Sequence, residues 1–551
     1  MKITSMTQAL SALALVLVLC SGVATAQKLS RSYYEDQHNG YRFRAPDDWL
    51  VIPTQAGQLE LGMTCRMEGA GKVMSSSGRT FTVKPALTVL LLEYPKLGKV
   101  PDSTPADLVE ERQSELEEDY EEALERLSIE GILYATLGGT RGIDIEDPKI
   151  DESFKARKKL EGRHRAWVAP NRTLDFYVDV YEFELEDAKL VLIYRIPDKL
   201  AKKWRNVFKS SAKSMELVEV ERTLAFEKGG TYRDILAYHE ELTSRTPGWR
   251  VLPTPSERFL IKTSSKNKQF VEEVIERLEL SRDLFERDFP PTEPITNVSV
   301  VRICGTEEEF HSYGGTSSGV GGWFSPQTAE LVLFDYRETD RNATYAVMSH
   351  EAFHQYCFYL FDRSEAHRWF DEGHGDYYGG AKFSRGKAKI TPKMPAGFDR
   401  LSVIKGMVQR DEWVPLEQHL NFDHGEWQNQ GPSNVSCYAQ SWSVIYMLRR
   451  GALGDVPRKL WQEEYADIIP NYIRVLQLGF RDAYAELLAE REEEARFEGR
   501  ELDEDELAIT TDDLGDGVKE EIWKAAIEAS WGQIDLDEFE ENWLTFVRKS
   551  L

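Results

Sequence analysis

Strand-like patterns of hydrophobic and polar positions dominate the first 220 residues. Short alternating or wholly apolar runs, bounded by turn-forming residues, predict five strands at residues 41–44, 49–52, 86–92, 176–184 and 189–196. Apolar residues at helical spacing predict helices over residues 106–127 and 199–215. This alternation predicts a self-contained domain of strands and helices over residues 27–220.

The second half of the chain changes from strands to helices along its length. A long amphipathic helix is expected over residues 269–289, and short apolar runs predict three strands at residues 259–262, 298–303 and 330–334. Beyond residue 460 the pattern is mostly helical. We therefore expect a second domain over residues 221–460, a helical subdomain over residues 461–551, and an α+β fold for the whole chain.

Composition adds limits on the class of partner. The 551 residues suggest about three domains at roughly 150 residues each. The net charge of −26 repels nucleic acid, so no nucleic-acid partner is expected. Residues 461–551 hold 9 basic and 26 acidic residues, a balance of −17, which leaves −9 for the rest. We interpret the densest acidic part, residues 490–516, as a solvated helix and loop, with calcium or partner binding as the less favoured alternative.

The first 26 residues have the pattern of a cleaved secretory signal. Lys2 precedes an apolar run over residues 9–19, and small residues stand just before Gln27. A lipoprotein signal acylated at Cys20 is the alternative, but the leucine before that cysteine is bulky where a small residue is preferred. No later run is long and apolar enough to span a membrane. The sequence therefore predicts a secreted or periplasmic protein.

Four cysteines remain after removal of the signal: Cys65, Cys304, Cys357 and Cys437. In an oxidising compartment four cysteines allow three pairings, and the sequence does not choose among them. Free buried thiols are an equally good interpretation.

The segment with clearest chemistry is His350-Glu351-x-x-His354. On a helix this spacing puts two imidazoles one turn apart on one face, where both reach one cation. Glu351 lies beside them, offset around the helix, where it can contact a metal-bound water. The alternative is a buried helix with two ordinary polar histidines.

A third ligand is available downstream, in the run Trp369-Phe-Asp-Glu-Gly-His-Gly-Asp-Tyr377. Glu372 follows His354 by 18 residues, enough for one helix to end and a second to return a carboxylate to the metal. Asp376, one turn later, is placed to accept a hydrogen bond from the far nitrogen of a ligating histidine. His374 is an alternative ligand, but about 200° of helical rotation separates it from Glu372, so we favour Glu372.

These two motifs resemble the gluzincin metallopeptidases, and among them the peptidase-MA-like families, with HExxH followed by Trp-x-x-Glu-Gly-x-Ala. The resemblance implies that His350, His354 and Glu372 bind Zn2+ and that Glu351 is the catalytic base. Gly375 stands where the family commonly has alanine, which is a mild departure. A zinc-activated water would then hydrolyse a peptide or protein substrate.

The similarity extends to both sides of the zinc motifs. Residues 321–326 and 330–334 resemble the family's glycine-rich turn and the strand beside its substrate cleft, although an internal hairpin is about equally compatible. Cys437-Tyr-Ala-Gln-Ser-Trp442 resembles a Tyr-Ala-Gln-Ser/Ala-Trp segment of the family. Tyr438 is therefore the candidate to stabilise the oxyanion of the tetrahedral intermediate, with a structural tyrosine as the alternative.

The N-terminal domain resembles the PsbP/Mog1-like α/β sandwich, a twisted antiparallel sheet with helices on its faces. The resemblance depends on element order and on phrases such as Tyr41-Arg-Phe-Arg-Ala-Pro46 and Ile193-Tyr-Arg-Ile-Pro197. No catalytic constellation is visible there, so we expect a spacer or a module that binds a protein partner.

Two rival functions stay open beside the secreted zinc peptidase. One is a non-catalytic binding or assembly protein on a zincin scaffold, although an intact Glu351 argues against it because such a protein has no need of the base. The other keeps the metal and hydrolyses a different amide or ester.

Overall fold

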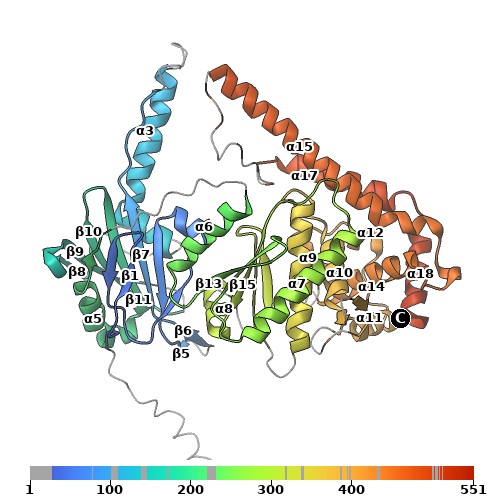
Figure 1. Ribbon diagram of the computed structural model, residues 1–551, viewed down its shortest axis with the longest axis horizontal. Helices are drawn as coiled ribbons and strands as arrows, with labels where there is room; N and C mark the ends of the chain where they lie inside the picture. The colour runs from blue at the N-terminus through green and yellow to red at the C-terminus, as the bar shows by residue number, and fades with distance from the viewer. Residues whose placement is uncertain are drawn as a thin grey trace, which may run out of the picture. The chain divides into compact units, whose positions relative to one another are not determined.

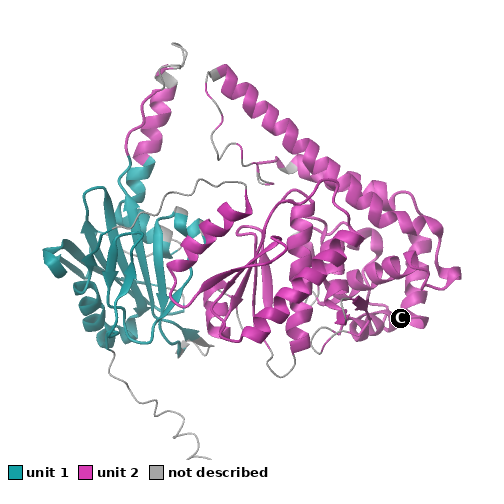
Figure 2. Ribbon diagram, in the orientation of Figure 1, with its two compact units in different colours: residues 1–95, 122–223 teal, residues 96–121, 224–551 magenta. Residues whose placement is uncertain are grey.

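The computed structural model divides the chain into two compact units (Figure 2). The N-terminal unit comprises residues 1–95 and 122–223, and the C-terminal unit residues 96–121 and 224–551. The structure describes residues 28–551 except 77–78, 101–108, 138–145, 171–172, 220–230, 315, 317–318, 337–340, 385–386, 394, 396–398, 431–434, 499, 501, 503–506, 508, 510 and 512. The predicted signal of residues 1–26, with Cys20, and the acidic run 503–506 lie outside the described residues.

A seven-stranded sheet, antiparallel throughout, forms the centre of the N-terminal unit (Figure 1). Its strands in spatial order are β3 (Leu50–Ile52), β4 (Met63–Glu68), β7 (Ala86–Glu93), β11 (Ala188–Pro197), β10 (Phe176–Glu184), β9 (Glu161–Ala169) and β8 (Ile150–Lys155). Strands β1 (Tyr34–Asp36), β2 (Tyr41–Phe43) and β12 (Glu216–Leu217) form a small second sheet, and β5 (Lys72–Ser76) pairs with β6 (Arg79–Val83). The predicted antiparallel-sheet domain is confirmed.

Alternation along the strands gives this sheet two buried faces. Leu192 and Tyr194 of β11 pack with Phe208 of α5 (Asp198–Lys213), whereas Val191 and Ile193 face a cluster that includes residues of α4 (Ile129–Leu137). Side chains in a strand point to opposite faces in turn, so one strand serves both clusters. Helices therefore cover both faces of the sheet. The remaining helices here are α2 (Ala56–Glu60), η1 (Arg157–Lys159) and α3 (Val109–Arg126), and the division between units falls within α3.

A mixed five-stranded sheet opens the C-terminal unit. Its order is β13 (Arg250–Pro253), β14 (Phe259–Thr263), β15 (Ser299–Cys304), β17 (Glu330–Phe334) and β16 (Gly322–Ser325). The central three strands are parallel, and both outer strands are antiparallel to their neighbours. Residues 330–334 are thus an internal strand, and the strand at the edge is β16.

The rest of the C-terminal unit is mostly helical, as predicted. Its elements are α6 (Tyr232–Ser244), α7 (Lys268–Asp288), α8 (Glu307–Gly314), α9 (Arg341–Leu360), α10 (Arg368–Gly379), β18 (Ala381–Ser384), β19 (Lys387–Ile390), α11 (Arg400–Gln409), α12 (Leu416–His419), α13 (His424–Gln428), α14 (Val435–Ala452), η2 (Arg458–Leu460), η3 (Glu463–Asp467), α15 (Ile468–Glu498), α17 (Asp516–Trp531) and α18 (Leu536–Lys549). One hydrophobic core joins Phe259 in the sheet to Val547 near the C-terminus, so the helices after residue 460 share it. No helix among the described residues is both long and apolar enough to cross a bilayer.

A buried charge cluster ties three neighbouring strands of this sheet together. Glu330 of β17 accepts hydrogen bonds from Lys262 Nζ at 2.8 Å, from Arg302 Nε and Nη2 at 2.9 Å each, and from Tyr313 Oη at 2.6 Å. Burial alone would raise the pKa of Glu330, but the two cations hold it far below its ordinary value. The carboxylate therefore stays ionised in the core.

All four cysteines of the described residues are free and buried, namely Cys65, Cys304, Cys357 and Cys437. Of the two interpretations left open by the sequence, the structure has the free thiols. Burial raises the pKa of each thiol, which keeps it protonated and unreactive.

Candidate metal centre

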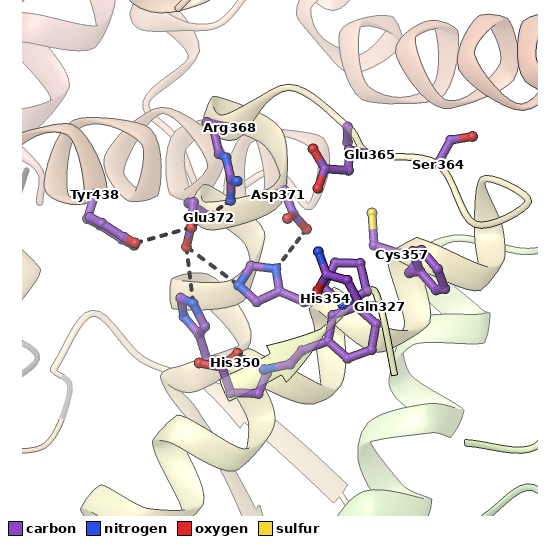
Figure 3. A pocket seen from close by; sticks show the side chains of 15 residues that line it. Gln327, His350, His354, Cys357, Ser364, Glu365, Arg368, Asp371, Glu372 and Tyr438 are labelled. Atoms are coloured by element: carbon purple, nitrogen blue, oxygen red, sulfur yellow. Dashed lines mark hydrogen bonds and ion pairs between the residues drawn. The ribbon is translucent and has the colours of Figure 1, made fainter. Parts of the chain in front are cut away.

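Two successive helices bring two histidines and a carboxylate to one point (Figure 3). His350 and His354 lie one turn apart on α9, and Glu372 lies on α10. Glu372 Oε2 is 3.2 Å from His350 Nε2 and 3.5 Å from His354 Nε2. The three ligand atoms all lie within 4.8 Å of one another, so one cation can contact all three.

A carboxylate lies beside the outer nitrogen of each of these histidines. His350 Nδ1 is 3.2 Å from Asp376 Oδ1, and His354 Nδ1 is 2.8 Å from Asp371 Oδ1. Arg400 Nε in turn donates to Asp376 Oδ2 at 2.6 Å. Such outer partners fix the tautomer and orientation of metal-binding histidines. Both rings are therefore set with Nε2 toward Glu372.

The ionisation of the three groups follows from their mutual contact. Burial would lower the pKa of His350, but its hydrogen bonds to Asp376 and Glu372 raise it to about 9. Burial would also lower the pKa of His354, but Asp371 and Glu372 raise this pKa well above its ordinary value. Burial would raise the pKa of Glu372, and the histidines lower it. The charges compensate one another, and a metal ion would displace the protons on Nε2.

Glu351 points into the same cavity from α9. Its Oε2 accepts a hydrogen bond from the backbone N–H of Phe324, at 2.9 Å, on edge strand β16. Burial raises the pKa of Glu351 above its ordinary value despite the neighbouring histidines. A carboxylate with a raised pKa is a better proton acceptor at neutral pH.

A third helix, α14, contributes Tyr438, whose hydroxyl points at Glu372 (Figure 3). Its hydroxyl donates to Glu372 Oε1 at 3.2 Å, and Arg368 Nη1 lies 3.4 Å from the same oxygen. Burial, followed by the carboxylates of Glu372, Asp376 and Glu351, raises the pKa of Tyr438, so the hydroxyl stays protonated. The predicted oxyanion donor thus lies against the ligand carboxylate.

Close approach of α10 to its neighbours depends on two glycines. A Cβ at Gly375 would lie 2.9 Å from His350 Cε1 and 3.0 Å from its Nδ1. A Cβ at Gly373 would lie 3.0 Å from the backbone oxygen of Ser441 on α14. An alanine methyl at position 375 would therefore press on the ring of His350.

His374 points away from the three ligands. Its ring is fully buried, its Nδ1–H donates to the carbonyl of Phe370 at 2.8 Å, and its centroid is 4.4 Å from the Phe370 ring and 5.0 Å from that of Phe289. From its position on α10 the His374 ring therefore packs among the aromatic side chains of the core. The geometry therefore favours Glu372 over His374.

The three ligands and Glu351 line a cavity of about 550 Å³. Beyond them its wall includes Gln327, Cys357, Ser364, Glu365 and Arg368. Cys357 contributes to the wall and is not part of the three-residue group. The cavity is large enough for a segment of a substrate beside the ligands.

Sequence reasoning missed three side chains of the centre. Asp371 directly precedes Glu372 and Arg368 precedes it by one turn, so both were within reach of a helical argument. Arg400 begins α11, and no spacing rule links it to Asp376.

No protein-family model and no curated protein matches the chain. Among solved structures, the chain is similar to cyanobacterial PsbP from Synechocystis, with 14% identity over 36% of this chain and 96% of that chain and a TM-score of 0.22. A mutant of the protein Mog1 matches with 12% identity over 35% of this chain and 97% of that chain, at a TM-score of 0.18. A crystal structure of a protein from Bacteroides thetaiotaomicron matches with 9% identity over 68% of this chain and 96% of that chain, at a TM-score of 0.19. PsbP and Mog1 folds are thus among the matched structures, as the N-terminal resemblance predicted.

Proposed function

We propose that the C-terminal unit is a zinc-dependent peptidase. The observation that carries the proposal is the convergence of His350, His354 and Glu372 within 4.8 Å, with Glu351 in the same cavity. Two imidazoles and one carboxylate are the protein ligands of a catalytic zinc site that leaves one position open.

The donor set fits zinc in its surroundings as well as in its ligands. Both histidines present Nε2 inward and have Nδ1 beside a carboxylate, of Asp376 and Asp371, as metal-bound imidazoles commonly do. When bound, zinc lowers the pKa of a coordinated water to about 7 and polarises a carbonyl. A mixed nitrogen and oxygen set of this kind suits zinc better than magnesium or calcium, which prefer oxygen ligands alone.

Glu351 is the residue placed to move protons. Its carboxylate accepts a proton from the attacking water and then delivers it to the leaving amine, which requires a carboxylate that exchanges protons near neutral pH. Burial supplies the raised pKa that this role needs, and the Phe324 N–H orients the carboxylate.

Tyr438 and Arg368 act on charge at the centre. The Tyr438 hydroxyl stays protonated, and by turning from Glu372 Oε1 it can donate to the carbonyl oxygen as negative charge develops there. Arg368 orients Glu372 through Oε1 and adds a positive charge to the cavity wall.

A peptide is the substrate class that the surroundings favour. Edge strand β16 borders the cavity through Phe324, and exposed strand edges pair with extended peptides by backbone hydrogen bonds. We further propose that the protein is secreted or periplasmic and that the N-terminal unit is a spacer or binds a protein partner, on the sequence grounds given above.

Metal content and turnover together test this function. Purified full-length protein should hold about one zinc per chain, His350→Ala should lose it, and Glu351→Gln should keep it while hydrolysis of a peptide library falls at least about a thousandfold. Glu365→Gln, an exposed carboxylate in the same cavity wall, is the matched control and should retain zinc and most activity. Absence of stoichiometric zinc would favour a binding protein on this scaffold, and zinc without peptide cleavage would favour hydrolysis of another amide or ester.

A further inference from the structure

A second cavity in the C-terminal unit has no part in the metal centre. Its volume is about 840 Å³, and its wall comes from the end of α7, from β19, the end of α14, η3 and the start of α15. It shares no lining residue with the cavity of the metal centre. Volumes of about 300–1,000 Å³ are typical of sites for one small molecule.

One side of this second cavity is apolar. Seven buried hydrophobic side chains line it: Leu284, Phe289, Tyr377, Leu448, Tyr465, Ile469 and Ile473. Leu453, also in the wall, is 68% exposed. An apolar ligand group placed here would be removed from water, at about 25 cal/mol per Å² of buried surface.

The polar part of the lining is strongly cationic. It contains Arg287, Lys389, Arg449, Arg450 and Arg474, against Asp288 as the one carboxylate among the described lining residues. Asp288 already accepts from Arg449 Nη2 at 2.5 Å, from Arg287 Nη2 at 2.8 Å and from the Tyr378 hydroxyl at 2.9 Å. The negative charge of Asp288 is therefore already balanced by Arg449 and Arg287.

Two of these cations stay uncompensated. Lys389 and Arg474 are exposed, and neither forms an ion pair with any carboxylate in the part of the chain that the structure describes. Arg450, by contrast, pairs with Asp455. An anionic group at the cavity would meet two unpaired positive charges beside an apolar wall.

We propose that this cavity binds a long-chain carboxylate, with the apolar chain against Leu284, Phe289 and Ile473 and the carboxylate beside Lys389 and Arg474. The combination of one apolar wall and one cationic group matches a ligand that is itself divided into a chain and an anionic end. A short anion would leave the apolar wall in water, and an uncharged chain would leave the cations unpaired.

Calorimetric titration of full-length protein with dodecanoate tests the proposal. We expect saturable 1:1 binding of dodecanoate, at least about tenfold weaker binding of dodecanol, and no measurable binding of butanoate. Charge reversal by Arg474→Glu should weaken dodecanoate binding about tenfold or more. Arg496→Glu, an exposed cation farther along α15 and outside the cavity, should not change it.

A second pair of variants tests the location of the chain. Ala466 is exposed and lines the cavity, so Ala466→Trp should fill the space and abolish binding, while Ala525→Trp, exposed on α17 and outside the lining, should not. Failure of dodecanoate to bind would overturn the proposal. Binding unchanged in both Arg474→Glu and Ala466→Trp, or dodecanol binding as tightly as dodecanoate, would overturn it as well.

Discussion

Replacing Glu330 by glutamine should destabilise the C-terminal unit more than any exposed carboxylate replacement. The carboxylate is 5% exposed and accepts four hydrogen bonds, three of them from the charged groups of Lys262 and Arg302. Glu330→Gln keeps the volume but leaves two buried cations without a counter-charge and turns an amide NH2 toward donors. Removing one partner from a buried ion pair costs about 3–5 kcal/mol, so we expect a loss of that size in the free energy of unfolding.

The matched control is Glu412→Gln in the same unit. Glu412 Oε2 lies 2.7 Å from Arg410 Nε, a distance similar to those in the buried cluster, but the two side chains are 53% and 60% exposed. Exposed pairs contribute about 0.2–1 kcal/mol, so this variant should lose no more than that. Adding Lys262→Met to Glu330→Gln should recover part of the lost stability, because it removes one of the stranded charges.

Urea unfolding followed by circular dichroism measures these differences at pH 7. The difference between wild type and Glu330→Gln should narrow as the pH falls below about 4.5. The pKa of Glu330 is lowered in the folded state, so its contribution is complete above the ordinary glutamate value and is lost as the unfolded chain takes up a proton. Equal stability of Glu330→Gln and Glu412→Gln would refute the claim that the cluster depends on its central carboxylate.

Four further predictions concern the metal centre, the N-terminal unit and the thiols. Asp371→Asn should weaken zinc affinity about 10- to 100-fold in a chelator competition, and unchanged affinity would contradict its role in orienting His354. Gly375→Ala should weaken zinc binding in the same assay because its methyl presses on His350. Burial lowers the pKa of His164, but Asp179 and Glu152 raise it, and the net shift is upward. The melting temperature of the N-terminal unit should therefore fall as the pH rises above about 6.5. A difference in melting temperature between wild type and His164→Gln that does not change with pH would contradict this. The four buried cysteines should react with Ellman's reagent only after unfolding, and a disulfide in peptide mapping would contradict the structure.

Short runs rich in apolar residues allowed four of the seven strands of the N-terminal sheet to be predicted, namely β3, β7, β10 and β11. The strands expected at residues 176–184 and 189–196 match β10 and β11 closely, because both faces of these strands are buried and their apolar content is high. Strands β4, β8 and β9 were missed, and the reason is clearest for β8 (Ile150–Lys155). It is an edge strand with mostly exposed residues, paired to β9 partly through Asp151–Arg163, so it has little apolar pattern.

The candidate metal centre was predictable where its members lie on one helix or on two successive helices. The spacing of His350 and His354 on α9, and the 18 residues from His354 to Glu372, predicted the group that the structure brings together. Arg400 and the hydrogen bond from Phe324 to Glu351 join different elements, and the order of strands that puts β16 at the edge is set by packing. No local pattern in the sequence contains that information.

Gly373 and Gly375 let the backbone of α10 come close to α14 and to the His350 ring, and this close approach sets the spacing of the candidate ligands. Neither residue has a side chain that reaches the cavity, yet α10 lies close to α14 at one and against the His350 ring at the other. In a diverged copy of this chain, a side chain at either position would push α10 or the His350 ring out of place with all three candidate ligands still present. The glycines are therefore as informative as the candidate ligands when such a copy is examined for an intact centre.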